Sequence, residues 1–204
     1  AFSPSGEGML CLNPDFFQYS KKSAILVWYF TFRSKTKSKK SFRGSQTNKQ
    51  WFIQMAIEYN REKIHQNQLI PYHPTTVSKI KLVEAPNLKY ALKYSNREIF
   101  KRLLLQSKAD DIIITQKGVI TDASYANVFF WNGVQWETPS TPLLNGTQRR
   151  LILNRKLAVE KKIHLNDIKQ YFHFKRVNAM MNWEDSHIEK IDMLFVKSKD
   201  RPEQ

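Results

Sequence analysis

Four short segments carry side chains whose types and order could do chemistry together. Lys93 precedes a predicted helix in ALKYSNRE, and Asp122 follows a predicted strand in GVITDASYANVFF. Gly146 begins a second predicted helix in NGTQRR, and Asn178 ends a predicted strand in RVNAMM. A lysine amine becomes a nucleophile when its pKa is depressed, and the N–H groups that begin a helix bind phosphate. Singly, these residues are typical of a solvated lysine, a turn aspartate and an ordinary helix start; the ordered set indicates a site.

Other common kinds of site are absent from the sequence. It contains neither Gly-x-Gly-x-x-Gly nor Gly-x-x-x-x-Gly-Lys, the loops that hold dinucleotides and nucleotide phosphates, and it has no Gly-x-Ser-x-Gly elbow. The five histidines lack the spacing of a metal site, so we expect no metal. The single cysteine excludes a disulfide framework within the chain and fits a reducing compartment.

The elements that must position these residues follow from apolar periodicity and turn residues. Gln116–Gly118 predicts a turn, and Asn132-Gly133 predicts a hairpin that joins NVFFW to VQW. Helices are predicted over Asn96–Gln106 with Asn96 as N-cap, from Gly146 through Leu157, and near Asn166-Asp167. Extended segments are predicted at Ala24–Phe32, Leu69–Pro74, Lys79–Glu84, Asp111–Thr115, Val119–Asp122, Asn127–Trp131, Val134–Trp136 and His173–Met181. Trp51–Tyr59 fits a strand or a short helix, and the strand is favoured. The pattern predicts an α+β fold with a sheet-rich second half.

The segment from about Pro74 to Asp192 resembles the class-IV aminotransferases, the fold-type IV family that includes branched-chain and D-amino-acid transaminases and aminodeoxychorismate lyase. ALKYSNRE is similar to the segment that holds the family's Schiff-base lysine, followed three residues later by Asn. VITDASYANVFF is similar to the stretch in which an acidic residue is followed, five residues on, by Asn-hydrophobic-Phe. WETPSTPLLNGTQR resembles the Thr-Pro … Gly-Ile-Thr-Arg element, and VNAMM resembles the Asn-Ala segment of the lyase branch.

This resemblance implies pyridoxal 5'-phosphate as cofactor and Lys93 as the catalytic lysine. It implies that Asp122 keeps the pyridine nitrogen protonated, which the electron-sink chemistry of this cofactor requires. The family usually has Glu there, so the shorter Asp requires a slight shift of the ring or the strand. The resemblance also implies that Arg149 lies near the phosphate, although an arginine at a helix start can instead pair with a carboxylate. The full set of implied cofactor-binding residues is Asp122, Asn127, Gly146, Thr147, Gln148, Arg149 and Asn178.

The function implied by the resemblance is transamination or lyase chemistry on an amino acid or an aminodeoxychorismate-like amine. A cytoplasmic homodimer is part of the same expectation. The alternative is a catalytically impaired relic of the fold that binds anions non-specifically.

The first part of the chain departs from the family pattern. We expect a short or atypical N-terminal domain over residues 1–76 and a cofactor-binding domain over 77–204. Neither the family's apolar-Glu-Thr strand nor its His-x-x-Arg is found in residues 1–60. Residues 1–50 hold nine Lys or Arg and two acids, so we expect them to be poorly ordered apart from Ala24–Phe32. Either this is a reduced first domain, or the first 50 residues are degenerate or read from a shifted frame.

The net charge of the chain is +15, and most of the basic excess of residues 1–50 lies in the run Phe32–Ser45. Such a run is usually a solvated loop, so we expect no specific nucleic-acid partner. The apolar run Ala24–Phe32 is too short to span a bilayer as a helix, and its aromatic and β-branched residues favour a buried strand over a role at a membrane.

Overall fold

The computed structural model describes residues 24–33, 50–59, 64–72, 77–94, 96–181, 183–184 and 186–195. The chain divides into two compact units, Ala1–Thr75 and Thr76–Gln204. Apart from residues 24–33 and 50, the prediction that residues 1–50 are poorly ordered lies outside the described part of the chain.

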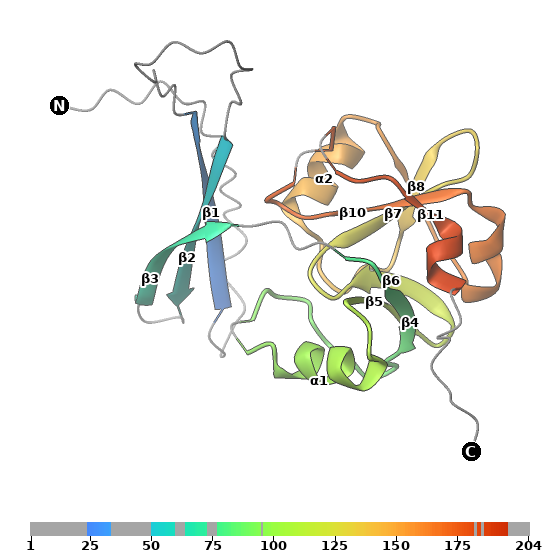
Figure 1. The fold of residues 1–204 in the computed structure, drawn as a ribbon, viewed down its shortest axis with the longest axis horizontal. Helices are drawn as coiled ribbons and strands as arrows, with labels where there is room; N and C mark the ends of the chain where they lie inside the picture. Colours follow the sequence, from blue (N-terminus) through green and yellow to red (C-terminus); the bar gives the residue numbers. More distant parts are fainter. Residues whose placement is uncertain are drawn as a thin grey trace, which may run out of the picture. The chain divides into compact units, whose positions relative to one another are not determined.

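The described part of the first unit is a three-stranded antiparallel sheet with the order β1-β2-β3 (Figure 1). Its strands are β1 (Ala24–Arg33), β2 (Gln50–Tyr59) and β3 (Ile64–Tyr72). Aromatic and β-branched residues, which favour a pleated surface, dominate β1. Pro71 lacks an N–H and is accommodated because β3 is an edge strand. The predicted strands at Ala24–Phe32 and Trp51–Tyr59 are confirmed.

The second unit begins with a β-α-β unit and a hairpin. Strand β4 (Ile80–Glu84) pairs in parallel with β5 (Asp111–Gln116), and α1 (Glu98–Ser107) makes the crossover that a parallel pair requires. Strand β6 (Val119–Ala123) returns antiparallel to β5. Lys117 and Gly118 have φ angles of 51° and 72°, as a two-residue hairpin turn with positive φ at both central positions requires. The predicted turn is confirmed.

A five-stranded sheet with the order β11-β10-β7-β8-β9 completes this unit. The strands β7 (Asn127–Trp131), β8 (Trp136–Pro139), β10 (His173–Val177) and β11 (Glu189–Lys190) are antiparallel neighbours. Strand β9 (Val159–Lys161) lies parallel to β8, and α2 (Thr147–Asn154) connects the two. The 3-10 helix η2 (Leu165–Gln170) precedes β10, and the 3-10 helix η3 (Ile191–Phe195) follows β11.

Alternation along the buried strands produces layers (Figure 1). On β5, Ile113 packs into the core that it shares with Phe130 of β7, whereas Ile112 and Ile114 pack with Phe100 of α1. On β7, Phe129 packs the other way, against Ile152 of α2. Because successive side chains of a strand point to opposite faces, the two sheets share one core and each is covered by one helix. The prediction of an α+β fold with a sheet-rich second half is confirmed.

Several predicted boundaries are wrong by a few residues. The N-cap of α1 is Arg97, although Asn96 Oδ1 accepts a hydrogen bond from the Glu98 N–H at 2.9 Å. The Asn132-Gly133 turn is a longer loop, because Asn132 Oδ1 accepts the N–H groups of both Val134 and Gln135 and delays β8 to Trp136.

Two further elements end earlier than predicted. Helix α2 ends at Asn154, before a left-handed Lys156 with φ 56°, so Leu157 lies outside it. Strand β10 ends at Val177, and Asn178 follows it rather than ending it. No helix in the described ranges is long and apolar enough to cross a membrane.

Candidate active site

Asp122 is a buried carboxylate at the end of β6. Only 4% of the residue is exposed. Its Oδ1 accepts a hydrogen bond from Asn127 Nδ2 at 2.7 Å, and its Oδ2 accepts one from the Leu144 N–H at 3.0 Å. Burial raises the pKa of Asp122 to about 6, while these hydrogen bonds and the positive charge of Arg149 act in the opposite direction. The carboxyl therefore changes its protonation close to neutral pH.

Asn127 joins this carboxylate to the start of α2. Its Nδ2 also donates to the Leu144 carbonyl at 2.8 Å. Gly146, the N-cap of α2, approaches so closely that an added Cβ would lie 2.2 Å from Asn127 Oδ1. A side chain at Gly146 is therefore incompatible with the position of Asn127. The first N–H groups of the helix that begins at Thr147, among them those of Thr147 and Gln148, have no partner within the helix.

Arg149 lies in the first turn of α2 but faces the protein. It is 2% exposed. Its Nη2 lies 2.5 Å from Glu160 Oε1 and donates to the Pro139 carbonyl at 2.8 Å, while Nη1 donates to Asn145 Oδ1 at 3.1 Å. The Nε atom is buried without a hydrogen-bond partner among the described residues. Of the two roles considered for Arg149, these contacts favour the pairing with a carboxylate.

Lys93 lies in the connection between β4 and α1, which follows the carboxyl end of a parallel strand. Its side chain is half-buried. Burial lowers the pKa of the amine from the ordinary 10.5 to about 8, and the positive charge of Arg97 acts in the same direction. A substantial fraction of the amine is therefore neutral near pH 8. Within the described part of the chain, no hydrogen bond or ion pair joins Lys93 directly to Asp122.

Arg97 connects the lysine segment to the loop that follows Asp122. Its Nη2 donates a short hydrogen bond to the Ser124 carbonyl, and its Nη1 donates to Tyr90 Oη at 3.1 Å. Sequence reasoning missed this residue. The signal was its place four residues after Lys93 and directly before a helix.

A buried polar network continues from this loop to the segment that carries Asn178. Ser124 Oγ donates to Asp111 Oδ1 at 2.5 Å, and Arg176 Nη1 lies 2.7 Å from Asp111 Oδ2. Arg176 also pairs with Glu189 at 2.7 Å. Asp111 and Arg176 are both buried and stand 65 positions apart in the sequence, so no local pattern could predict their pairing. Arg176 is two positions before Asn178, so the network reaches the segment that carries Asn178.

The segment after β10 is fixed by Lys175 and Trp183. The Lys175 amine donates to the Trp183 carbonyl at 2.9 Å and lies 4.3 Å from the centroid of the Trp183 ring. Asn178 Oδ1 accepts the Met180 N–H at 2.8 Å, which forms a tight turn directly after the strand. These contacts hold the turn that begins at Asn178.

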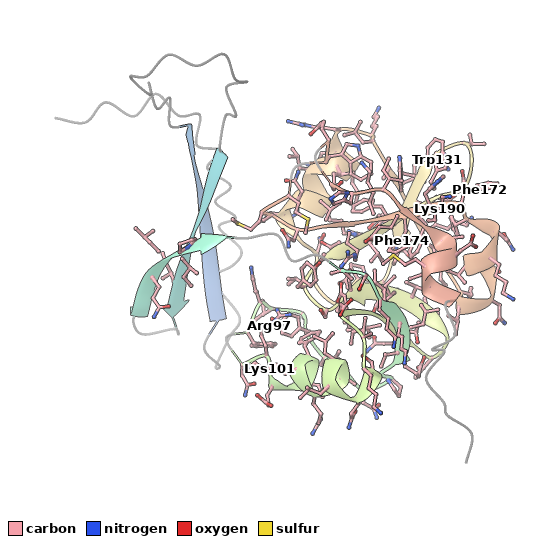
Figure 2. All side chains as sticks on the ribbon, viewed as in Figure 1. Arg97, Lys101, Trp131, Phe172, Phe174 and Lys190 are labelled. Carbon is pink, nitrogen blue, oxygen red and sulfur yellow. The ribbon has the colours of Figure 1, made fainter. Side chains whose placement is uncertain are left out.

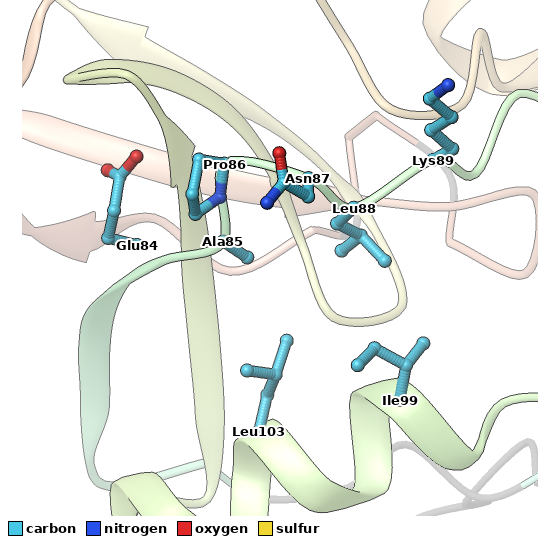
Figure 3. Close-up of a pocket in the computed structure, with 8 residues that line it drawn as sticks. All are labelled: Glu84, Ala85, Pro86, Asn87, Leu88, Lys89, Ile99 and Leu103. Atoms are coloured by element: carbon cyan, nitrogen blue, oxygen red, sulfur yellow. The ribbon is translucent and has the colours of Figure 1, made fainter.

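An apolar pocket of about 410 Å³ lies between α1 and the start of the β4–α1 connection (Figure 3). Leu103 and Ile99 of α1 face Leu88 across it. Its one carboxylate, Glu84, is already engaged by the Thr115 hydroxyl at 2.5 Å and the Lys117 N–H at 2.6 Å. None of the residues predicted for the site lines this pocket.

The structure thus brings Asp122, Asn127 and Gly146 into direct contact. Lys93 reaches the same loop through Arg97. Asn178 connects to it through Arg176 and Asp111, and Arg149 turns away toward Glu160.

Comparison with known proteins identifies the family. Residues 21–183 match the family described as amino-transferase class IV. The chain belongs to this family. The match begins at residue 21 and so includes part of the first unit, whereas the sequence motifs show the resemblance only from about Pro74.

Related proteins agree with this assignment. An uncharacterized protein of Haemophilus influenzae is 37% identical over 129 residues, which cover 63% of this chain and 68% of the relative. A crystal structure from Haemophilus somnus 129pt, provisionally named a 4-amino-4-deoxychorismate lyase, is 34% identical with a TM-score of 0.60 and covers 65% of this chain and 68% of that one.

A hypothetical aminotransferase of Mycobacterium tuberculosis, solved in a PLP-bound form, is 11% identical with a TM-score of 0.53. The match covers 71% of this chain and 61% of that one, and it reflects the shared fold alone. Class-IV aminotransferases have the fold-type IV architecture, so this part of the fold prediction is confirmed.

Proposed function

We propose that this protein is a pyridoxal-phosphate-dependent enzyme that acts on an amino acid or on an aminodeoxychorismate-like amine. One observation carries the proposal. The buried Asp122 carboxylate is joined through Asn127 and the Leu144 N–H to the residues that begin α2. A carboxylate and a helix start are the two fixed groups needed at opposite ends of a phosphorylated pyridine.

The residues present fit this cofactor. Asp122 accepts hydrogen bonds from Asn127 Nδ2 on Oδ1 and from the Leu144 N–H on Oδ2, and a carboxylate offers about four acceptor sites, so it can also accept a pyridinium N–H. The Thr147 and Gln148 N–H groups, at a helix N-terminus that favours negative charge, would hold the phosphate. The turn at Asn178 would lie beside them. Lys93 would hold the aldehyde end through its amine, whose lowered pKa makes the neutral, nucleophilic form available.

Arg149 stabilises the start of α2 and does not bind the phosphate in this proposal. Its Nη atoms donate hydrogen bonds to Glu160, Pro139 and Asn145, and these bonds fix the first turn of the helix. The phosphate contacts then come from backbone N–H groups and from the Thr147 hydroxyl.

When bound, the cofactor supplies an electron sink for the bond that breaks at the substrate Cα. The contribution of Asp122 is a buried negative charge that keeps the pyridine nitrogen protonated. Lys93 would hold the cofactor through its amine and, when that amine is free and neutral, would take up the proton that leaves the substrate Cα. The pKa of about 8 suits this exchange because a proton shuttle works best near the operating pH.

The lyase branch is the narrower proposal for the reaction. It is supported by the 34% identity with the Haemophilus somnus protein and by the Asn-Ala segment at Asn178. Transamination of an amino acid is the second candidate, since the family match alone covers both. Assembly as a homodimer is part of the proposal and is tested by light scattering.

The test is titration of the purified chain with pyridoxal phosphate, followed by visible absorbance. We expect a bound-cofactor band in the wild type and in Lys89→Ala, an exposed lysine four residues away, and its loss in Lys93→Ala. Incubation with 4-amino-4-deoxychorismate, or with an amino acid and a 2-oxo acid, then separates the two reactions by their products. A chain that binds no cofactor in any form would contradict the proposal.

A further inference from the structure

Arg97 stands between the lysine segment and the loop after β6, and two sets of contacts fix its guanidinium. One set consists of the hydrogen bonds to the Ser124 carbonyl and to Tyr90 Oη. The other consists of aromatic rings: the guanidinium carbon lies 4.7 Å from the centroid of Phe100 and 5.6 Å from that of Tyr90. An arginine held on both sides in this way has little freedom to swing into solvent.

The segment that Arg97 fixes is short and carries Lys93. Lys93 and Arg97 are four positions apart in the sequence, and α1 begins only at Glu98. The hydrogen bond from Arg97 to the Ser124 carbonyl joins this stretch of sequence to the loop that follows Asp122. Both cationic residues, Lys93 and Arg97, are partly buried.

The charged and titratable groups around this pair come from three elements. The phenols of Tyr90 and Tyr94 lie in the same connection, with ring centroids 5.6 Å apart. From β5, the Asp111 carboxylate lies behind Ser124, where it is neutralised by Arg176 of β10 at 2.7 Å. Because that carboxylate already has a cationic partner, it does not offset the charge of Arg97. For Lys93 itself, burial is the first cause of the lowered pKa and the positive charge of Arg97 is the second.

We infer that Arg97 is a positioning residue for Lys93, which ties the lysine segment to the loop after Asp122 and keeps a fixed positive charge four positions along the chain from the lysine. The tether sets where the amine lies, and the charge favours its neutral form. This inference rests on the proposed role of Lys93 and adds to it a residue that the sequence comparison did not indicate.

Two readouts on the full chain without cofactor separate the charge from the tether. The first is the pH dependence of Lys93 modification by an amine-reactive acylating reagent, followed by peptide mass spectrometry. The second is hydrogen exchange in a peptide that covers residues 119–126. The variants are Arg97→Met, which removes both functions, and Arg97→Lys, which keeps the charge but lacks the planar fork that bonds two acceptors at once.

The matched control is Lys101→Met, which removes an exposed cation from the next turn of α1 (Figure 2). We expect Arg97→Met to raise the midpoint of Lys93 labelling by about one pH unit, while Arg97→Lys and Lys101→Met leave it unchanged. Both Arg97 variants, but not Lys101→Met, should speed exchange in residues 119–126 by about fivefold or more. If Arg97→Met does not fold, Arg97→Gln replaces it as a neutral variant.

An unchanged midpoint in the folded neutral variant, or an equal rise in Lys101→Met, would overturn the charge effect. Unchanged exchange in residues 119–126 would overturn the tether. Because both readouts are made without cofactor, they can fail while Lys93 still binds the cofactor. Conversely, they can succeed in a chain that binds none, so the two proposals are tested separately.

Discussion

Asn127 donates its side-chain amide to Asp122 Oδ1 at 2.7 Å and to the Leu144 carbonyl at 2.8 Å. This one side chain therefore connects the end of β6 to the start of α2. The two elements are separated by more than twenty residues of sequence, yet the hydrogen bonds fix the carboxylate and the helix start as one unit. The first three predictions test this unit.

Asp122→Asn should retain the cofactor but lose about 10²–10³-fold in kcat, because a neutral amide does not hold the pyridine nitrogen protonated. Steady-state kinetics and the visible spectrum measure the two effects. Asp122→Glu is the matched control, since it restores the carboxylate that the family usually has. It should keep kcat within about tenfold of the wild type, because overpacking by a methylene is a cost to stability rather than to charge. Full turnover in Asp122→Asn would contradict the electron-sink role.

The stability of the cofactor-free protein should depend on Asp122 between about pH 4 and pH 6. The pKa of this carboxyl is raised from 3.8 to about 6 on folding, so within this window the unfolded state has lost a proton that the folded state still holds. Stability from this group therefore falls as pH rises through the window, by about 3 kcal/mol in total. Urea unfolding of the wild type, compared with Asp122→Asn at each pH, isolates the effect. A difference between the two proteins that does not vary with pH would show that Asp122 titrates normally.

Gly146→Ala should weaken cofactor binding and stability together. The new Cβ would meet Asn127 Oδ1 at 2.2 Å and push that side chain off Asp122. Gly118→Ala is the control, because it places a side chain at φ 72° with no atom within 4 Å and is strained only by its backbone, at about 1–2 kcal/mol. We expect the first variant to lose cofactor affinity at least tenfold and the second to keep it. Equal cofactor affinities in the two variants would show that Gly146 is not part of the cofactor site.

Arg149→Met should destabilise the fold with little effect on cofactor affinity. It leaves the Pro139 carbonyl and Asn145 without their donor, and it removes a buried charge that pairs with Glu160. We expect a loss of about 2–4 kcal/mol in unfolding free energy and a change in cofactor Kd of less than about threefold. Glu160→Gln, which keeps a hydrogen-bond acceptor, should lose less stability. A folded Arg149→Met protein that no longer binds cofactor would assign Arg149 to the phosphate instead.

Much of the second unit was predictable because its signals are local. The continuous apolar run of β5, the positive-φ turn at Gly118 and the helical face of α1 each depend on neighbouring residues. The wrong boundaries lie where a single residue interrupts the regular backbone hydrogen bonding of a strand or a helix. Asn132 captures two backbone N–H groups and lengthens its turn, and a left-handed Lys156 ends the segment before Leu157 can join α2.

The site was predictable only in part, for the same physical reason. Motif order indicated Asp122, Asn127 and Gly146, and these residues are in contact. Which way a side chain turns depends on partners that are distant in sequence, so the pairing of Arg149 with Glu160 was only one of two open alternatives. The Asp111–Arg176 pair depends wholly on a tertiary contact between residues 65 positions apart, and the position of Arg97 directly before α1 did not by itself indicate its hydrogen bond to Ser124.

The most direct test of this account is borohydride reduction of the cofactor-loaded protein, followed by peptide mapping. We expect the visible band to be lost and a pyridoxyl group to be attached to the peptide that contains Lys93, with Lys89 unmodified. The lowered pKa of the Lys93 amine favours this result, because the neutral amine is the reactive form. Attachment at Lys89, at several surface lysines in proportion to their exposure, or at no lysine would contradict the central claim.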